Sequence, residues 1–150
     1  MLMSIALALH VLAFTVWVGG MFFAHQALRP AAVSTLEPPM RLRLWKATFA
    51  RFFPWVWWSI IIILATGLWM MFQFPKPPIF VHIMLALGIV MMAIFLHVFF
   101  SPYSKLIKAV DAEDWKEGGR LLGQIRMLIG INLSIGLITI VIATAGKFFI

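Results

Sequence analysis

Four histidines are the residues of this sequence best suited to chemistry, and they form two pairs with the same spacing. His10 and His25 are fifteen residues apart, and so are His82 and His97. The sequence around them is 63% hydrophobic with a mean hydropathy of +1.03, so we expect these imidazoles to lie in or near a lipid bilayer. An ionisable side chain is costly in a bilayer and by default indicates a functional site.

The equal spacing has a geometric consequence if the two pairs lie on parallel helices. Fifteen residues separate two rings by about 22 Å along a helix and leave them roughly 60° apart around its axis. Bringing His10 level with His82 therefore also brings His25 level with His97, which gives two layers. On the second of these helices we predict that one face lines a ligand groove, with small residues between the rings: His82, Ala86, Val90, Ala93 and His97.

Paired axial histidines on two helices are a common way to hold haem in membrane proteins, and the axial ligand tunes the iron. The pattern therefore predicts a protein that binds one or two haem b groups and works in electron transfer or redox chemistry. A haem-dependent oxidoreductase with a quinone or another redox partner would fit. In this hypothesis four histidines are the iron ligands, a tryptophan forms a wall and two arginines pair with the propionates: His10, His82, His97, His25, Trp17, Arg51 and Arg126.

Copper is the alternative metal. Imidazole and thioether groups both bind copper, and methionine favours Cu(I). The chain has ten methionines, and Met84 follows His82 by two residues while Met21 precedes His25 by four. The chain has no cysteine, which excludes thiolate metal sites and iron–sulfur clusters. The residues themselves leave haem and copper both open.

Four long apolar segments must position these histidines. They cover residues 2–27, 52–73, 79–100 and 127–148, and about 20 apolar residues suffice to cross roughly 30 Å of hydrocarbon. Charged residues make up only 11% of the chain, against about 25% in soluble domains. We therefore predict an all-α integral membrane protein, with a single domain of four transmembrane helices in an up-down bundle.

The basic residues predict the orientation of this bundle. Ten of the twelve lysines and arginines lie between the first and second or between the third and fourth apolar segments. By the positive-inside rule these two loops are cytoplasmic, and both termini face outward. The net charge of +7 is thus explained by contact with lipid headgroups rather than nucleic acid. The lipid bilayer is the expected partner, and assembly into a homo-oligomer is compatible with this pattern.

Short motifs occur in all four segments: His10, Trp17-Val18-Gly19-Gly20-Met21-Phe22-Phe23, Arg29-Pro30, Gly67-Leu68-Trp69, Val81-His82-Ile83, Leu96-His97, Pro102-Tyr103, Arg126, Asn132-Leu133 and Gly136. With these motifs the sequence resembles the CopD (copper resistance protein D) family of bacterial inner-membrane proteins. The resemblance implies copper uptake or resistance at that membrane, with His10, His82 and His97 at family positions. His25 is outside the motif.

The same pattern is similar to membrane protoporphyrinogen oxidases of the HemJ type, which implies haem b held by histidine. Those oxidases carry a lysine two residues after the histidine that corresponds to His82. Met84 occupies that position here, which disfavours porphyrinogen oxidation as the reaction.

Overall fold

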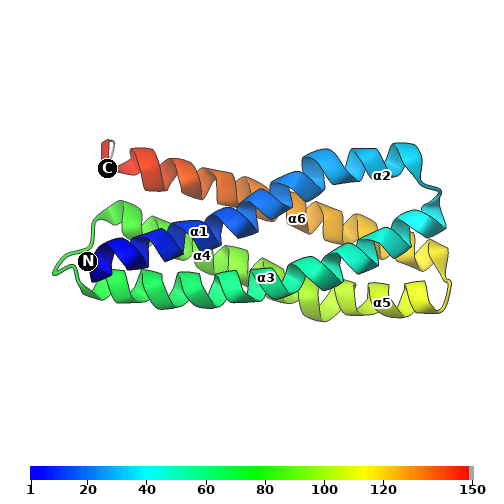
Figure 1. The fold of residues 1–150 in the computed structure, drawn as a ribbon, viewed down its shortest axis with the longest axis horizontal. Helices are drawn as coiled ribbons and strands as arrows, with labels where there is room; N and C mark the ends of the chain where they lie inside the picture. The colour runs from blue at the N-terminus through cyan, green and yellow to red at the C-terminus, as the bar shows by residue number, and fades with distance from the viewer. Residues whose placement is uncertain (149–150) are drawn as a thin grey trace.

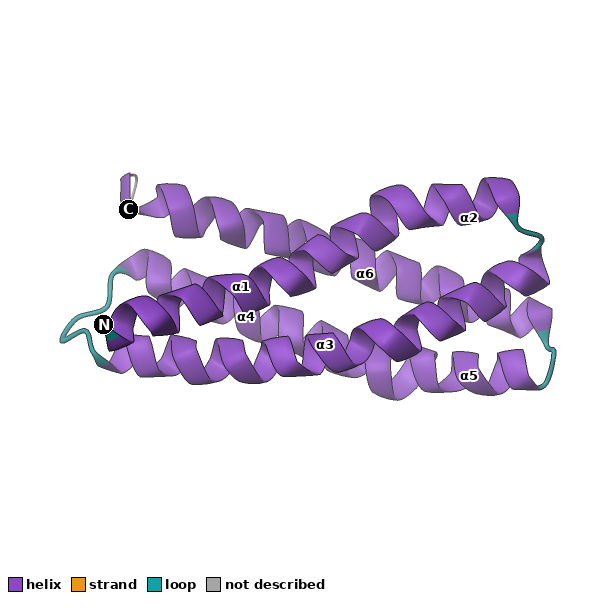
Figure 2. Cartoon of the chain, in the orientation of Figure 1, coloured by secondary structure: helices purple, strands orange, loops and turns teal. Residues whose placement is uncertain are grey.

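The computed structural model describes residues 1–148, and within that range the chain is helical apart from short turns (Figures 1 and 2). Four helical rods, 2–35, 38–72, 79–111 and 115–148, are each long and apolar enough to cross a membrane. This confirms the prediction of an all-α protein with four spans. The rods are longer than the predicted apolar segments, because the basic residues between those segments continue the helices instead of forming loops. Rods of 33 to 35 residues are about 50 Å long, so they exceed the hydrocarbon thickness.

The first and third rods each contain a π-helical segment. The elements in chain order are α1 (Leu2–Phe23), η1 (Ala24–Leu28), α2 (Arg29–Thr35), α3 (Pro38–Phe72), α4 (Ile79–Val98), η2 (Phe99–Tyr103), α5 (Ser104–Asp111), α6 (Trp115–Ala145) and η3 (Gly146–Phe148). Both termini lie at one end of the bundle, which we call the termini end (Figure 1). The opposite end, formed by α2, α5 and the first turns of α3 and α6, carries most of the basic residues and is called the basic end.

A proline accounts for each π-helical segment. Pro30 has no N–H to donate to the carbonyl one turn earlier, and its ring clashes with that carbonyl. The helix widens just before it, and the N–H of Arg29 bonds the carbonyl of Ala24, five residues back. Pro102 lies inside the second π segment, η2. Segments of this kind occur frequently at functional sites, and η1 contains His25.

The four rods pack as two antiparallel hairpins, α1 with α3 and α4 with α6. α1 also contacts α6, and α4 also contacts α3, so α1 and α4 lie at opposite corners of the bundle. Large side chains fill the centre between them. The rings of Trp17 on α1 and Phe95 on α4 meet edge to face with 6.2 Å between their centroids, and Phe53 on α3 meets Phe95 at 5.4 Å. Met91 is fully buried beside them.

The predicted ligand groove on α4 is wrong, because that face points away from the bundle. His82, Ala86, Val90, Ala93 and His97 are all exposed. The face of α4 that is buried carries bulky side chains instead: Met91, Met92, Phe95 and Val98. Lipid tails are as apolar as a protein core, so dispersion packing rather than hydrophobicity selects the inward face of a membrane helix. Large aromatic and thioether side chains gain most from that packing.

Candidate functional site

The half-buried imidazole of His10 lies between α1 and α3. Its Nδ1 atom is 2.9 Å from the hydroxyl oxygen of Thr66 on α3. The same hydroxyl lies 2.6 Å from the carbonyl oxygen of Ile62, one turn earlier on α3, and donates its hydrogen to it. A hydroxyl has a single hydrogen to donate. Thr66 must therefore accept the hydrogen bond from His10, and His10 carries its proton on Nδ1.

This tautomer leaves the lone pair of His10 on Nε2. The hydrogen bond to Thr66 is made through Nδ1 and does not involve Nε2. Histidines that bind metals typically donate the other ring N–H to a fixed acceptor, which sets the orientation and tautomer of the ring. Thr66 supplies that acceptor, so His10 is held in the form in which imidazole coordinates a metal.

A glycine makes room for the His10 ring. A Cβ atom at Gly67 would lie 2.9 Å from the Cε1 atom of His10, closer than real Cβ contacts allow. Only a residue without a side chain lets the ring lie against α3 at this point. Thr66 and Gly67 are adjacent, so one turn of α3 both orients the ring and accommodates it.

His25, in the π-helical segment η1 that continues α1, also lies against a glycine. A Cβ atom at Gly130 on α6 would be 3.1 Å from Nε2 of His25. The Nδ1 atom of His25 is 3.4 Å from the amide nitrogen of Gln26, a long contact that fixes the ring weakly. His25 is partly buried and lines a hollow at the basic end.

A small cavity between the levels of the two histidines is lined by further groups that can bind a metal. Its volume is about 20 Å³, and Met21 of α1 and Asn132 of α6 are among its lining residues. Asn132 is buried and donates its amide N–H to the carbonyl of Met91 at 3.3 Å. Its Oδ1 atom is buried without a hydrogen-bond partner among residues 1–148. Such an orphaned acceptor favours a small guest that can contact it.

The remaining predicted site residues lie elsewhere. His82 is exposed near the termini end, where its Nδ1 is 3.2 Å from the carbonyl of Pro78, and His97 is exposed on the outer face of α4. Trp17, predicted as a wall of the haem site, is buried, and its ring packs on Phe95. Arg51 is exposed and donates to the carbonyl of Ala47 in its own helix. Exposed Arg126 lines the same hollow as His25.

These positions do not fit a haem gripped between α1 and α4. Within residues 1–148 no three histidine or acidic side chains converge on a common point. The cavity in the middle of the bundle, at about 20 Å³, is far smaller than the roughly 300–1,000 Å³ typical of sites for organic ligands. We therefore derive no step through haem. The arrangement instead offers single imidazole, thioether and amide groups to a small ion.

Comparison with known proteins agrees with a metal-handling function. The copper resistance protein D family matches residues 46–145, two thirds of the sequence. The chain belongs to the copper resistance protein D family. No curated protein and no solved structure matches the chain. The match gives no support to the predicted similarity to protoporphyrinogen oxidases.

The match to the copper resistance protein D family covers most of α3 and all of α4 and α6. It includes Thr66 and Gly67, which contact His10, Gly130, which lies against His25, and Asn132. His10 and His25 themselves precede the matched region. Neither Thr66 nor Gly130 stands out as a site residue in the sequence. These residues can be recognised only when it is known that the first helix packs against α3 and α6. The spacing of the histidines does not reveal that packing.

Proposed function

We propose that this protein is a membrane copper-binding protein that passes copper along the inside of its first helix. The observation that carries the proposal is the His10 ring, oriented by Thr66 with Nε2 left as a ligand. Membership of the copper resistance protein D family is the reason for proposing copper as the metal. Imidazole nitrogen and thioether sulfur are both suitable copper ligands, and sulfur selects Cu(I).

The distribution of donors along α1 supports passage rather than storage. His10, Met21 and His25 follow one another along the helix, about 16 Å and then about 6 Å apart at 1.5 Å per residue. Asn132, whose amide oxygen is unsatisfied within residues 1–148, lines the same cavity as Met21. No position gathers a closed set of strong ligands among residues 1–148, so an ion would be held at each position by few groups and could leave it again.

The orientation of the protein is part of the proposal. The basic end would lie in the cytoplasm by the positive-inside rule, with both termini on the outer side of a bacterial inner membrane. His82 would then be exposed near the outer surface, and His25 would lie near the inner one.

The decisive experiment compares His10→Ala with His97→Ala. Both variants remove an imidazole from a membrane helix, but only the first removes a ring that faces a neighbouring helix. Cu(I) affinity of the purified protein is measured by competition with a chromophoric chelator. We expect affinity to fall by at least about tenfold in His10→Ala, the loss of one good ligand contact, and to stay within about twofold in His97→Ala. Equal affinity in the wild type and in His10→Ala would rule the proposal out.

The visible spectrum of the same samples tests the haem hypothesis directly. The copper proposal predicts a preparation without a reduced-minus-oxidised haem α-band when the cells are supplied with haem. A stoichiometric α-band that disappears in His10→Ala would restore haem as the ligand of His10.

A further inference from the structure

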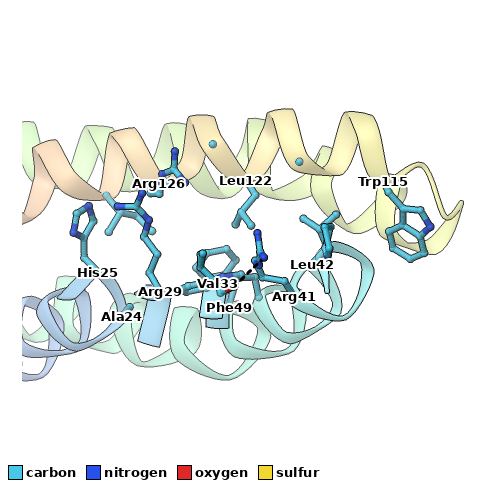
Figure 3. A pocket seen from close by; sticks show the side chains of 15 residues that line it. Ala24, His25, Arg29, Val33, Arg41, Leu42, Phe49, Trp115, Leu122 and Arg126 are labelled. Atoms are coloured by element: carbon cyan, nitrogen blue, oxygen red, sulfur yellow. Dashed lines mark hydrogen bonds between the residues drawn. The ribbon is translucent and has the colours of Figure 1, made fainter. Parts of the chain in front are cut away.

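A hollow at the basic end lies between η1 and α2, the first turns of α3 and the first turns of α6 (Figure 3). Its volume is about 170 Å³, more than ten times the roughly 10–15 Å³ that a single water occupies on this measure. Arg29, Arg41, Arg126 and His25 line it, and none of its lining residues is acidic. The hollow therefore has the size for a polyatomic guest and a strong positive charge.

The arginines of this hollow have no carboxylate partners among residues 1–148. Figure 3 shows Arg29 and Arg41 reaching from α2 and α3 toward α6, where Arg126 lies. The basic end is held by ion pairs that leave these three arginines out. The ion pairs within residues 1–148 join Arg43 to Glu113, Lys46 to Asp111 and Arg120 to Glu117. Three arginine side chains thus line one hollow, and none of them is ion-paired with a carboxylate among residues 1–148.

Arg41 is the clearest sign of a missing acceptor. Its Nη2 donates to the carbonyls of Val33 at 3.3 Å and Leu36 at 3.1 Å, which fixes the guanidinium plane. Its Nε is buried and has no hydrogen-bond partner among residues 1–148. A buried donor without an acceptor is unfavourable. Because Nη2 is already used by two carbonyls, Arg41 can donate to an oxyanion in the hollow only through its remaining N–H groups.

The residues that line the hollow indicate that its ligand also has an apolar part. Trp45, Phe49 and Ile129 form an apolar wall toward the middle of the bundle. On α6 the wall consists partly of Gly119 and Gly123, one turn apart, where a Cβ atom would meet nothing within 4 Å. The hollow exists because side chains are missing at these two positions. A guest with a charged group and an apolar part fits these walls better than a bare ion does.

We propose that this hollow binds a phosphate group, and that the group belongs to an anionic phospholipid. The three arginines hold the phosphate oxygens, and the apolar wall takes the glycerol and the upper acyl chain. The lipid thereby bridges the two hairpins at the basic end, where α2 and α6 are separated by the hollow. This site is distinct from the copper-binding position at His10 and does not depend on it.

Native mass spectrometry of the full chain in a neutral detergent tests the site, with phosphatidylglycerol as the probe. We expect phosphatidylglycerol to bind the wild type and to bind Arg41→Gln about tenfold more weakly, the loss of one charge-assisted contact. Arg51→Gln is the matched control, because Arg51 is an exposed arginine of the same end that bonds only its own helix. Equal weakening in the two variants would overturn the proposal, since general surface charge would explain it.

A variant in which a side chain fills the hollow distinguishes binding inside the hollow from attraction to the charges around it. Gly123→Leu retains every arginine but occupies the space, so we expect phosphatidylglycerol binding to fall as in Arg41→Gln. If Gly123→Leu does not insert into the membrane, Gly119→Leu provides the same test from the exposed side of the wall. Full binding to a folded leucine variant would overturn the pocket as the site.

Inorganic phosphate distinguishes the two sources of the phosphate group. We expect millimolar phosphate to compete poorly with phosphatidylglycerol, because it lacks the part that contacts Trp45 and Phe49. Strong, Arg41-dependent binding of inorganic phosphate alone would overturn the lipid as the source and assign the hollow to a free phosphate.

Discussion

α1 and α4 carry histidines with the same fifteen-residue spacing, yet they use them in opposite ways. Both histidines of α1 turn toward neighbouring helices, His10 onto Gly67 of α3 and His25 onto Gly130 of α6. Both histidines of α4 are exposed. Equal spacing along two helices therefore does not place rings on equivalent faces.

The difference lies in the size of the side chains that stand opposite each histidine. His10 and His25 each meet a glycine, where the absence of a side chain makes space for a ring beside a helix backbone. The inward face of α4 is occupied by Met91, Phe95 and Val98, which leaves no room for an imidazole. A histidine enters a packed membrane bundle where a small residue stands opposite it, and that residue belongs to another helix.

The largest expected effect tests which face of α4 packs against the bundle. Phe95→Ala removes a ring that contacts Trp17, Phe53 and Trp57. A lost ring volume of roughly 100 Å³ at about 24 cal/mol per Å³ of cavity gives a loss of about 2–3 kcal/mol in the free energy of unfolding. The measurement is reversible unfolding in mixed detergent micelles.

The neighbouring Leu96, which is 39% exposed, serves as the control for this prediction. Leu96→Ala should change the free energy of unfolding by less than about 0.5 kcal/mol, as is usual for surface substitutions. Similar losses in the two variants would show that the face carrying His97 is packed, and the contrast between α1 and α4 would disappear.

Much of the fold follows from the sequence, but the inward faces do not. The four apolar segments predicted the four helices that are long and apolar enough to span a membrane, but not the continuation of the third helix through Pro102 to Asp111. In a bilayer, however, the side facing lipid and the side facing protein are both apolar, so hydropathy does not distinguish them. Small residues such as Ala86 and Ala93 were therefore assigned to a groove, although they face outward.

The candidate site was predictable only in part for a similar reason. His10 stood out because an ionisable group inside a span is unusual. Thr66 did not, since threonine in a membrane helix commonly bonds its own backbone, as Thr144 does here. The role of Thr66 depends on its being opposite His10, which is a property of two helices together. Likewise Arg29, Arg41 and Arg126 are far apart in sequence and meet only at the basic end.

The second prediction removes the feature that sets His10 apart. Thr66→Val keeps the shape of the side chain but takes away the acceptor of the Nδ1–H bond. Loss of such an outer partner lowers metal affinity by about 10–100-fold in known sites, and we expect the lower end here because the ring stays wedged beside Gly67. Cu(I) competition titration measures the change.

Thr144→Val is the matched control for this second variant. Thr144 is exposed and its hydroxyl bonds only carbonyls of its own helix, so the variant should bind Cu(I) as the wild type does. If Thr66→Val and Thr144→Val bind Cu(I) equally well, the hydrogen bond to Thr66 has no role in presenting His10 to a metal.

The third prediction concerns the space that Gly130 leaves beside His25. A Cβ atom at Gly130 would lie 3.1 Å from Nε2 of His25, so the ring must move by a few tenths of an ångström in Gly130→Ala. We expect the free energy of unfolding to fall by less than about 1 kcal/mol, because the ring is weakly held and open to the hollow. Gly88→Ala on α4, where a Cβ meets nothing within 4 Å, should instead gain about 0.5–1 kcal/mol from helix propensity. A lower free energy of unfolding in Gly130→Ala and a higher one in Gly88→Ala would confirm that the space beside His25 is filled and the space beside Gly88 is open. Changes of the same sign in the two variants would contradict it.

The smallest effect is expected from the histidines of α4 themselves. The double variant His82→Ala/His97→Ala removes two exposed rings, of which only His82 makes a hydrogen bond, to the carbonyl at the start of its own helix. Because neither ring touches the bundle interior, the free energy of unfolding should change by less than about 0.5 kcal/mol. Cu(I) affinity should stay within about twofold of the wild type, since 0.4 kcal/mol corresponds to about that ratio. A tenfold loss of Cu(I) affinity would instead mean that the outer face of α4 contributes a ligand, and that a second molecule completes the site across that face.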